Sequence, residues 1–236
     1  MIQRPIFAPI LAGATLPDRL FACLGAAVGI AVTALAAWGF FTLVPDLALA
    51  SLPLVVAPMG ASAVLVFAVP ASPLAQPWPV IGGNVISAVV GVTVAHWVPN
   101  MPLAAGLAVG LAILAMSLSR SLHPPGGAAA LTAVIGGPAV FAAGYEFPFL
   151  PIGLNALVLV AAGLIYHRFS GHSYPHRPVP AAGHVIPASS LIPHPEDIDK
   201  ALEDLGESFD VSREDLDLLF AQVERHAAAR RGSVRA

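Results

Sequence analysis

Residues 117–129 read SLSRSLHPPGGAA, which places an arginine, a histidine, two prolines and two glycines inside one of the most apolar stretches of the chain. Proline has no backbone N–H and pushes the residue before it out of helical geometry. A helix that enters this stretch must therefore end by about Leu122, and a new helix can start at Pro125, where a missing N–H costs nothing. The small residues after the prolines leave the positive end of the new helix open to an anion. They are Gly126, Gly127 and Ala128.

The composition around this stretch is that of a membrane protein. Hydrophobic residues make up 57% of the 236, and the mean hydropathy is +0.79. Of the 11 basic and 14 acidic residues, 18 lie between Gly171 and Ala236, and Arg120 is the only one from Leu47 to Tyr145. A soluble core does not need so long a stretch with one charge, so the first 170 residues are expected in a lipid bilayer.

Proline, glycine and polar residues divide this region into six apolar segments. A helix needs about 20 residues to cross the hydrocarbon core. The second and fifth segments are exceptional, because Pro and Gly near their starts leave only a short apolar helix beyond the break. The six segments are 20–44, 52–69, 80–98, 103–118, 124–143 and 151–169.

The charges in the loops predict an orientation. Six spans with both termini in the cytoplasm place Asp46 and Glu146 outside and every loop arginine inside, as the positive-inside rule requires. These arginines are Arg4, Arg19, Arg120, Arg168 and Arg177. The loop charges thus favour a multi-pass protein with both termini in the cytoplasm, and the membrane that we expect is a bacterial inner membrane.

The two halves of the region resemble each other. PMGASAV (58–64) is similar to PPGGAAA (124–130), and PVIGGNVISAVVG (79–91) to PIGLNALVLVAAG (151–163). Three spans per half would turn the second copy upside-down, as in transporters with broken helices at equivalent positions. The predicted fold is all-α, a polytopic transmembrane helical bundle of two inverted repeats of three segments, with the second segment of each broken by Pro and Gly. The other interpretation is that apolar helices look alike by chance.

Three domains are expected. Residues 1–170 form the transmembrane domain, 171–194 a linker rich in Pro and His, and 195–236 a short soluble tail of two amphipathic helices. The first tail helix is predicted to begin at Pro195 and to end near Gly206, and the second to be capped by Ser212.

The candidate ligand-binding residues lie at the two breaks and in the following segments. Pro58 starts a helix equivalent to that at Pro125, and its first turn contains Gly60, Ala61 and Ser62. Each break is also compatible with an ordinary junction at the membrane surface. Arg120 could bind the anion or anchor a cytoplasmic loop, and His123 could carry a proton or hydrogen-bond the broken backbone. Asn84 and Asn155 lie in matching segments, where polar side chains either join helices or line a path.

Other kinds of function are not indicated. The single cysteine, Cys23, excludes disulfides and a cysteine metal site. We find no serine elbow, phosphate-binding loop or paired carboxylates, so we expect no enzyme, no cofactor, no metal site and no nucleic-acid partner. The pairs Gly25–Gly29 and Gly106–Gly110 are predicted to permit close helix packing, and they make a homo-oligomer plausible.

The sequence also resembles a known family. SRSLHPPGGAAAL contains the His-Pro-Pro motif of the HPP family of integral membrane proteins, and APMGASAVLVF, SPLAQPWPVIGGNVISAVVGV and LAGATLPDRLFACLGAAVGI are similar to its pattern in order. The resemblance covers roughly residues 10–170. Family members are usually described with about four transmembrane helices, and some from chloroplasts and cyanobacteria are nitrite transporters. Many bacterial members continue into paired CBS domains, whereas this chain ends soon after the helix that precedes them.

The resemblance implies a transporter or channel for a small inorganic anion, nitrite first. The expected partners are that anion, the lipid bilayer and further copies of the chain. The alternative function is a non-transporting scaffold or sensor subunit that docks a partner through its acidic C-terminal tail.

Overall fold

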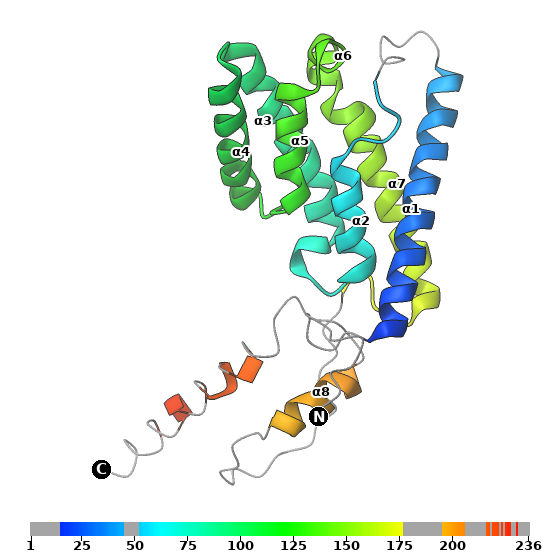
Figure 1. Cartoon of the computed structure of the whole chain (residues 1–236), viewed down its shortest axis with the longest axis vertical. Helices are drawn as coiled ribbons and strands as arrows, with labels where there is room; N and C mark the ends of the chain where they lie inside the picture. The colour runs from blue at the N-terminus through cyan, green and yellow to red at the C-terminus, as the bar shows by residue number, and fades with distance from the viewer. Residues whose placement is uncertain are drawn as a thin grey trace, which may run out of the picture. The chain divides into compact units, whose positions relative to one another are not determined.

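The computed structural model describes residues 15–44, 52–176 and 195–205, together with scattered positions between 216 and 230. The chain divides into two compact units, Leu20–His176, called the membrane unit below, and residues 1–19 with 177–236. The elements within the described ranges are all helical, as the sequence predicts (Figure 1).

The helices follow the apolar segments. They are α1 (Leu16–Leu43), α2 (Pro58–Ala68), α3 (Asn84–Trp97), α4 (Met101–Leu118), α5 (Pro124–Ile135), α6 (Pro138–Ala143), α7 (Leu154–Ser170) and α8 (Pro195–Leu205). Two short 3-10 turns are η1 (Pro73–Ala75) and η3 (Gly144–Glu146). Two π-helical turns, η2 (Pro79–Gly83) and η4 (Pro148–Gly153), lead directly into α3 and α7.

Four helices are long and apolar enough to cross a membrane. They are Leu16–Leu43, Pro79–Trp97, Met101–Leu118 and Pro148–Ser170. A fifth candidate is the pair formed by α5 with residues Pro138–Glu146, which is bent by 96° at its break. The number of candidate spans among the described residues is therefore four or five, and the prediction of six helical spans is too high.

The second predicted segment, 52–69, is not a spanning helix. Its helix α2 has 11 residues, a rise of about 16 Å, whereas the hydrocarbon core is about 30 Å thick. Residues 52–57, which precede α2 and contain Pro53, form no helix. Apolar composition alone does not distinguish such a segment from a helix.

The fifth segment begins at Pro124 as predicted, and α5 starts at the same residue, one before the predicted helix start at Pro125. It breaks a second time, after Ile135, because Gly137 has φ of 86° and Pro138 follows it. A positive φ is a conformation that glycine adopts at no steric cost. This break was not predicted.

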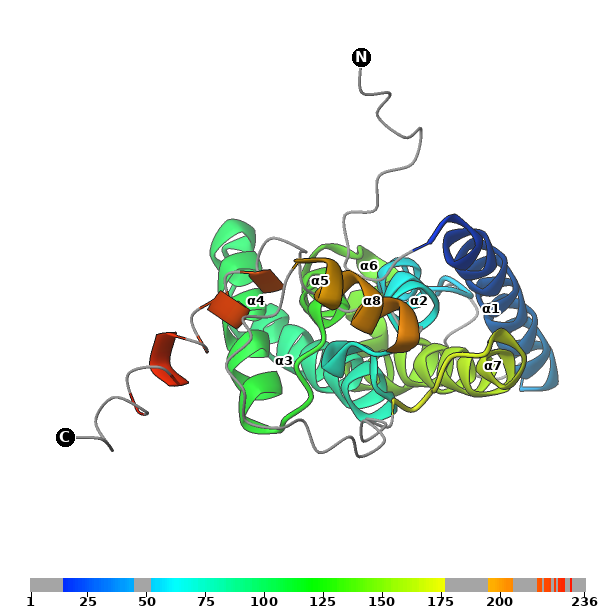
Figure 2. The same cartoon turned by 90° about the horizontal axis from the view of Figure 1, so that it is seen from below.

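The directions of the helices are visible in Figure 1. In the membrane unit α1, α3 and α5 run one way along the bundle, and α2, α4 and α7 run the other way. Helix α3 packs against α4 and α5, and α2 packs against α5 and α7. Seen from below in Figure 2, α2 lies between α5 on one side and α1 on the other. The short helix α2 is therefore surrounded by longer ones.

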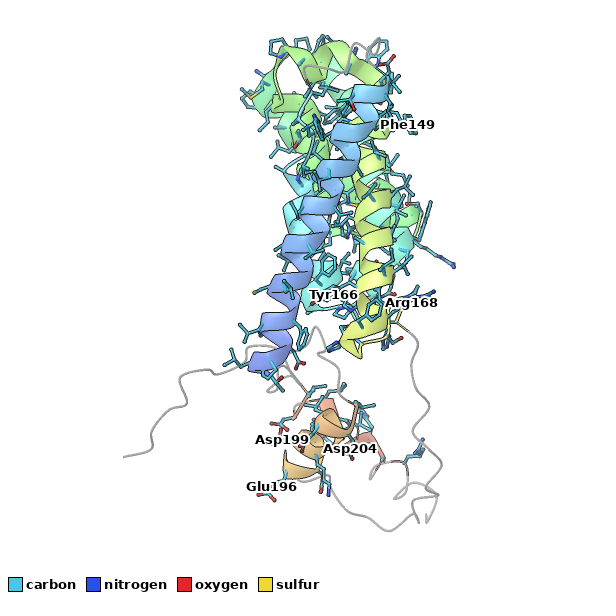
Figure 3. All side chains as sticks on the ribbon, turned by 90° about the vertical axis from the view of Figure 1, so that its right-hand side faces the viewer. Phe149, Tyr166, Arg168, Glu196, Asp199 and Asp204 are labelled. Carbon is cyan, nitrogen blue, oxygen red and sulfur yellow. The ribbon has the colours of Figure 1, made fainter. Side chains whose placement is uncertain are left out.

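The glycine pair in α1 packs as predicted. A Cβ atom added to Gly25 or Gly29 would lie 2.7 Å or 2.6 Å from the ring of Phe67. Figure 3 shows Tyr166 on α7 close to α1, where its hydroxyl donates to the carbonyl of Phe21 at 2.7 Å. The prediction is wrong for Gly106 and Gly110 within the described chain, because no atom lies within 4 Å of a Cβ added at either position.

The residues that follow α7 pack on the connection between α2 and α3. Tyr174 is buried, and its hydroxyl donates to the carbonyl of Ala75 at 3.0 Å. The backbone N–H of His176 donates to Oε1 of Gln76 at 2.8 Å. The remaining linker residues, 177–194, lie outside the described residues, and the predicted domain boundaries stay predictions.

In the tail, α8 begins at Pro195 as predicted, and Ile198 and Leu202 pack with Leu216. Gly206 and the predicted cap Ser212 lie outside the described residues.

Candidate functional site

The connection between α4 and α5 is a tight reversal built from the stretch 117–129. Helix α4 ends at Leu118, and the N–H of Ser121 donates to the carbonyl of Met116 at 2.8 Å. Arg120 has φ of 54°, a left-handed conformation that glycine normally occupies at a helix C-terminus. The helix therefore ends before Leu122, as predicted, and the turn places an exposed arginine directly before the buried Ser121.

His123 lies at the centre of the site. It is fully buried, and its φ of −142° and ψ of 109° are the extended geometry expected before a proline. Its Nδ1 lies 2.8 Å from the carbonyl oxygen of Leu74, and its Nε2 lies 2.8 Å from Oγ of Ser62. Since a carbonyl only accepts, the neutral ring carries its proton on Nδ1, and Nε2 accepts from the Ser62 hydroxyl, whose Oγ also lies 3.1 Å from the carbonyl oxygen of Pro58.

Asn84 extends this hydrogen-bond chain from α3. Its Nδ2 donates to Oγ of Ser62 at 3.2 Å and to the carbonyl of Val80 at 2.8 Å. Ser87 lies one turn further along α3, on the same face. We call Ser62, Asn84, Ser87 and His123 the polar cluster. All four side chains have 0% exposure. Three predicted site residues from separate segments, Ser62, Asn84 and His123, thus meet in the core.

The start of α5 packs closely against this cluster. Gly126 is buried, and a Cβ added to it would lie 2.7 Å from Oγ of Ser87 and 2.8 Å from the carbonyl oxygen of Gly83. Because one of these atoms belongs to the backbone, any side chain at this position would push α3 and α5 apart. The small size of Gly126 therefore serves close packing.

The other predicted helix-start residues are more open. Gly60, Ala61 and Ala128 are exposed, and Gly127 is half-buried. A Cβ added to Gly60 would meet no atom within 4 Å, and one added to Gly127 would meet only Val109, at 3.8 Å. These positions could carry larger side chains without a clash.

Asn155 lies outside the cluster. It is fully buried in α7, where its Oδ1 accepts from the N–H of Val56 and its Nδ2 donates to the carbonyl of Leu54, both at 3.0 Å. Both ends of its amide therefore hold the chain that leads into α2. The structure gives Asn155 the role of joining segments.

Arg120 also lies apart from the cluster. Its side chain is exposed. The backbone carbonyl of the preceding residue, Ser119, accepts a hydrogen bond at 3.1 Å from Nε1 of Trp78. Trp78 lies in the connection between α2 and α3. The loops at 69–78 and 119–123 therefore lie at the same end of the membrane unit, with Arg120 exposed there.

Sequence reasoning missed Ser87 and the carbonyl of Leu74. Ser87 could have been found, because it follows Asn84 by three residues in an apolar helix and so shares its face. Leu74 lies in a connecting loop and contributes only its backbone, which no sequence pattern indicates.

The comparisons with known proteins agree with this architecture. The family model described as "HPP, transmembrane region" matches residues 12–175. Two transmembrane proteins of Dictyostelium discoideum are similar to the chain. One is 41% identical over 131 residues, covering 53% of this chain and 46% of its own length. The other is 38% identical over 115 residues, covering 47% of this chain and 37% of its own length.

The chain thus spans less than half the length of these curated relatives, and their names state only that they are transmembrane proteins. No solved structure matches the chain. The family match covers most of the membrane unit, including the His123-Pro124-Pro125 motif at the polar cluster, and the chain is a multi-pass membrane protein that belongs to the family of the HPP transmembrane region.

Proposed function

We propose that this protein moves a small inorganic anion, nitrite first, across a bacterial inner membrane, with both termini on the cytoplasmic side. Membership of the family supports the proposal, because some members of this family are nitrite transporters. Arg120 in the connection after α4 and Arg168 in the last turn of α7 are both exposed, which is compatible with the proposed orientation.

We further propose that the membrane unit consists of two inverted repeats. Each half has a short helix with proline at its start, α2 or α5, and the two run in opposite directions (Figure 1). Each half then has a π-helical turn that leads into a helix with asparagine in its first turn, Asn84 or Asn155. π-Helical turns are rare and are frequent at functional sites.

The observation that carries the proposal is the contact between Ser62 and His123. It joins the first turn of α2 to the residue before α5 at 2.8 Å, and both side chains are fully buried. Neither short helix is long enough to cross a membrane on its own. Interrupted helices whose starts meet at buried polar groups are the arrangement that transporters use to bind a solute inside the membrane.

In this proposal, the exposed first turns of the two short helices guide the anion toward the polar cluster. Gly60 and Ala61 in α2 and Ala128 in α5 are exposed and Gly127 is half-buried, so small residues leave the positive ends of the two helix dipoles uncovered by large side chains. Arg120 attracts anions to the cytoplasmic end.

The test is flux through purified protein in lipid vesicles. Wild type is expected to move nitrite faster than empty vesicles, and Gly60→Leu to move less. The matched control is Gly106→Leu on α4, because both glycines are exposed and have no atom within 4 Å of an added Cβ. Gly126 is unsuitable, since any substitution there disrupts packing. Absence of flux for nitrite, nitrate, formate and chloride would refute the proposal.

A scaffold that docks a partner through the tail is the alternative. In α8, Ile198 and Leu202 are buried, while Glu196, Asp199 and Asp204 are exposed and labelled in Figure 3. This acidic surface is the observation that favours docking. Removing residues 195–236 separates the two functions, because the transport proposal expects flux to persist.

A further inference from the structure

Two polar atoms of the polar cluster have no hydrogen-bond partner among the described residues. They are Oδ1 of Asn84 and Oγ of Ser87, and both side chains have 0% exposure. Leaving a buried polar group unpaired costs about 1–3 kcal/mol. Because the two residues are one helical turn apart on α3, one small molecule can contact both.

The direction of the hydrogen bonds defines what that molecule must offer. The Asn84 amide donates to Ser62, Ser62 donates to His123, and His123 donates to the carbonyl of Leu74. All donors in this series of hydrogen bonds are thus occupied, and the acceptor without a partner is the side-chain carbonyl oxygen of Asn84. A carbonyl oxygen accepts only, so its missing partner must donate a hydrogen bond.

The second contact is a hydroxyl beside a helix start. Oγ of Ser87 lies against Gly126 in the first turn of α5, where the positive end of the helix dipole favours electron-rich atoms. A hydroxyl can donate as well as accept. The site therefore combines one acceptor that needs a donor with one hydroxyl that can donate to an oxygen.

Apart from the helix dipole, the described surroundings hold no charged side chain that would neutralise a bare negative charge. Of the residues described in the membrane unit, the charged ones are Arg120, Glu146 and Arg168, and all are exposed. His123 is the titratable side chain in the cluster, while the neighbouring His167 and Tyr174 bond to the carbonyls of Val66 and Ala75. Burying an unpaired ion costs several kcal/mol even after relaxation.

We propose that Asn84 and Ser87 bind the transported solute as a neutral, protonated oxyacid, which is nitrous acid when the solute is nitrite. The inference rests on the proposed function and extends it to the species that crosses. The acid O–H donates to Oδ1 of Asn84, and another oxygen of the acid accepts from Oγ of Ser87. The acid forms from nitrite and a proton on one side and separates into both on the other side, so no net charge moves.

The experiment measures nitrite flux and proton flux together. Purified full-length protein is placed in vesicles that contain a pH-sensitive dye, and a potassium gradient with valinomycin sets the membrane potential. One proton should accompany each nitrite, and a potential of either sign should leave the rate unchanged. Empty vesicles give the leak of nitrous acid, which is subtracted.

Two variants test the residues. Asn84→Leu keeps the number of side-chain heavy atoms and removes the acceptor together with the amide that donates to Ser62 and Val80, whereas Ser87→Ala removes the hydroxyl alone. Each should lower the flux about tenfold, the equivalent of one hydrogen bond of ordinary strength. Ser117→Ala on α4 is the matched control, because Ser117 is exposed and bonds only within its own helix. If Asn84→Leu fails to fold, Ser87→Ala decides.

The outcomes are distinguishable. Flux that follows the membrane potential without protons would overturn the neutral-acid inference and leave anion transport standing. Wild-type flux in both variants would also overturn it, because the two atoms would then bind structural water alone. Absence of flux for nitrite, nitrate, formate and chloride would refute the proposed function, and the inference with it.

Discussion

Replacing Arg120 by glycine should separate the structural role of this residue from its proposed role in transport. Arg120 has φ of 54° at the end of α4. A left-handed conformation costs a residue with a side chain about 1–2 kcal/mol. Glycine avoids that cost but loses about 0.5–1 kcal/mol more through its flexibility in the unfolded chain. Arg120→Gly should therefore stabilise the fold by about 0.5–1 kcal/mol.

The same substitution should slow transport. A unit charge about 8 Å from a passing ion in water changes the local anion concentration about twofold. Flux by Arg120→Gly should therefore be about half that of wild type at low ionic strength. The difference should vanish in about 1 M salt, where the screening length falls to about 3 Å.

Thermal unfolding in detergent and nitrite flux in vesicles measure the two effects. Arg120→Lys is the control, because it keeps both the charge and the unfavourable conformation. A lower thermal midpoint in the glycine variant would refute the argument from backbone strain. Equal flux of the glycine and lysine variants at low salt would refute the electrostatic role and leave Arg120 as a loop anchor.

Further substitutions test the buried contacts. Asn155→Leu removes two buried hydrogen bonds and should lower the free energy of unfolding by about 2–4 kcal/mol; an unchanged thermal midpoint would contradict the role given to this residue. Gly29→Ala should cost about 1–3 kcal/mol, because the added methyl meets Phe67, and Gly39→Ala, which also lies in α1 but has no atom within 4 Å, should instead raise stability by about 0.5–1 kcal/mol in the same measurement. Burial raises the pKa of Tyr174, so the unfolded chain ionises first and stability should fall above about pH 10. Thermal midpoints of Tyr174→Phe should fall less above this pH than those of wild type. An identical fall in both proteins would contradict the role of Tyr174.

The starts of the short helices could be predicted because they depend on local chemistry. Proline fixes the backbone at Pro58 and Pro124 whatever surrounds it, and both helices begin there. The number of spanning helices could not be predicted in the same way. The chain leading into α2 is held at Leu54 and Val56 by Asn155, which lies about a hundred residues away.

The candidate site was predicted residue by residue but not as an assembly. Ser62, Asn84 and His123 stand out as polar residues in apolar surroundings, and the sequence contains no signal that they contact one another. Their meeting depends on tertiary packing and on the π-helical turn at 79–83, which changes the face on which Asn84 lies. The left-handed conformation of Arg120 could not be predicted either, because the residue that ends a helix in this conformation is usually glycine.

The most direct test of a transport route is whether water and solute reach the starts of α2 and α5. Ala61→Cys and Ala128→Cys, each made in a Cys23→Ser background, should react with a membrane-impermeant thiol reagent, and nitrite should slow the reaction. Leu111→Cys on the exposed face of α4 should stay unlabelled, since lipid would cover it. Labelling of neither alanine position, or labelling that nitrite leaves unchanged, would contradict a solute path at these helix starts.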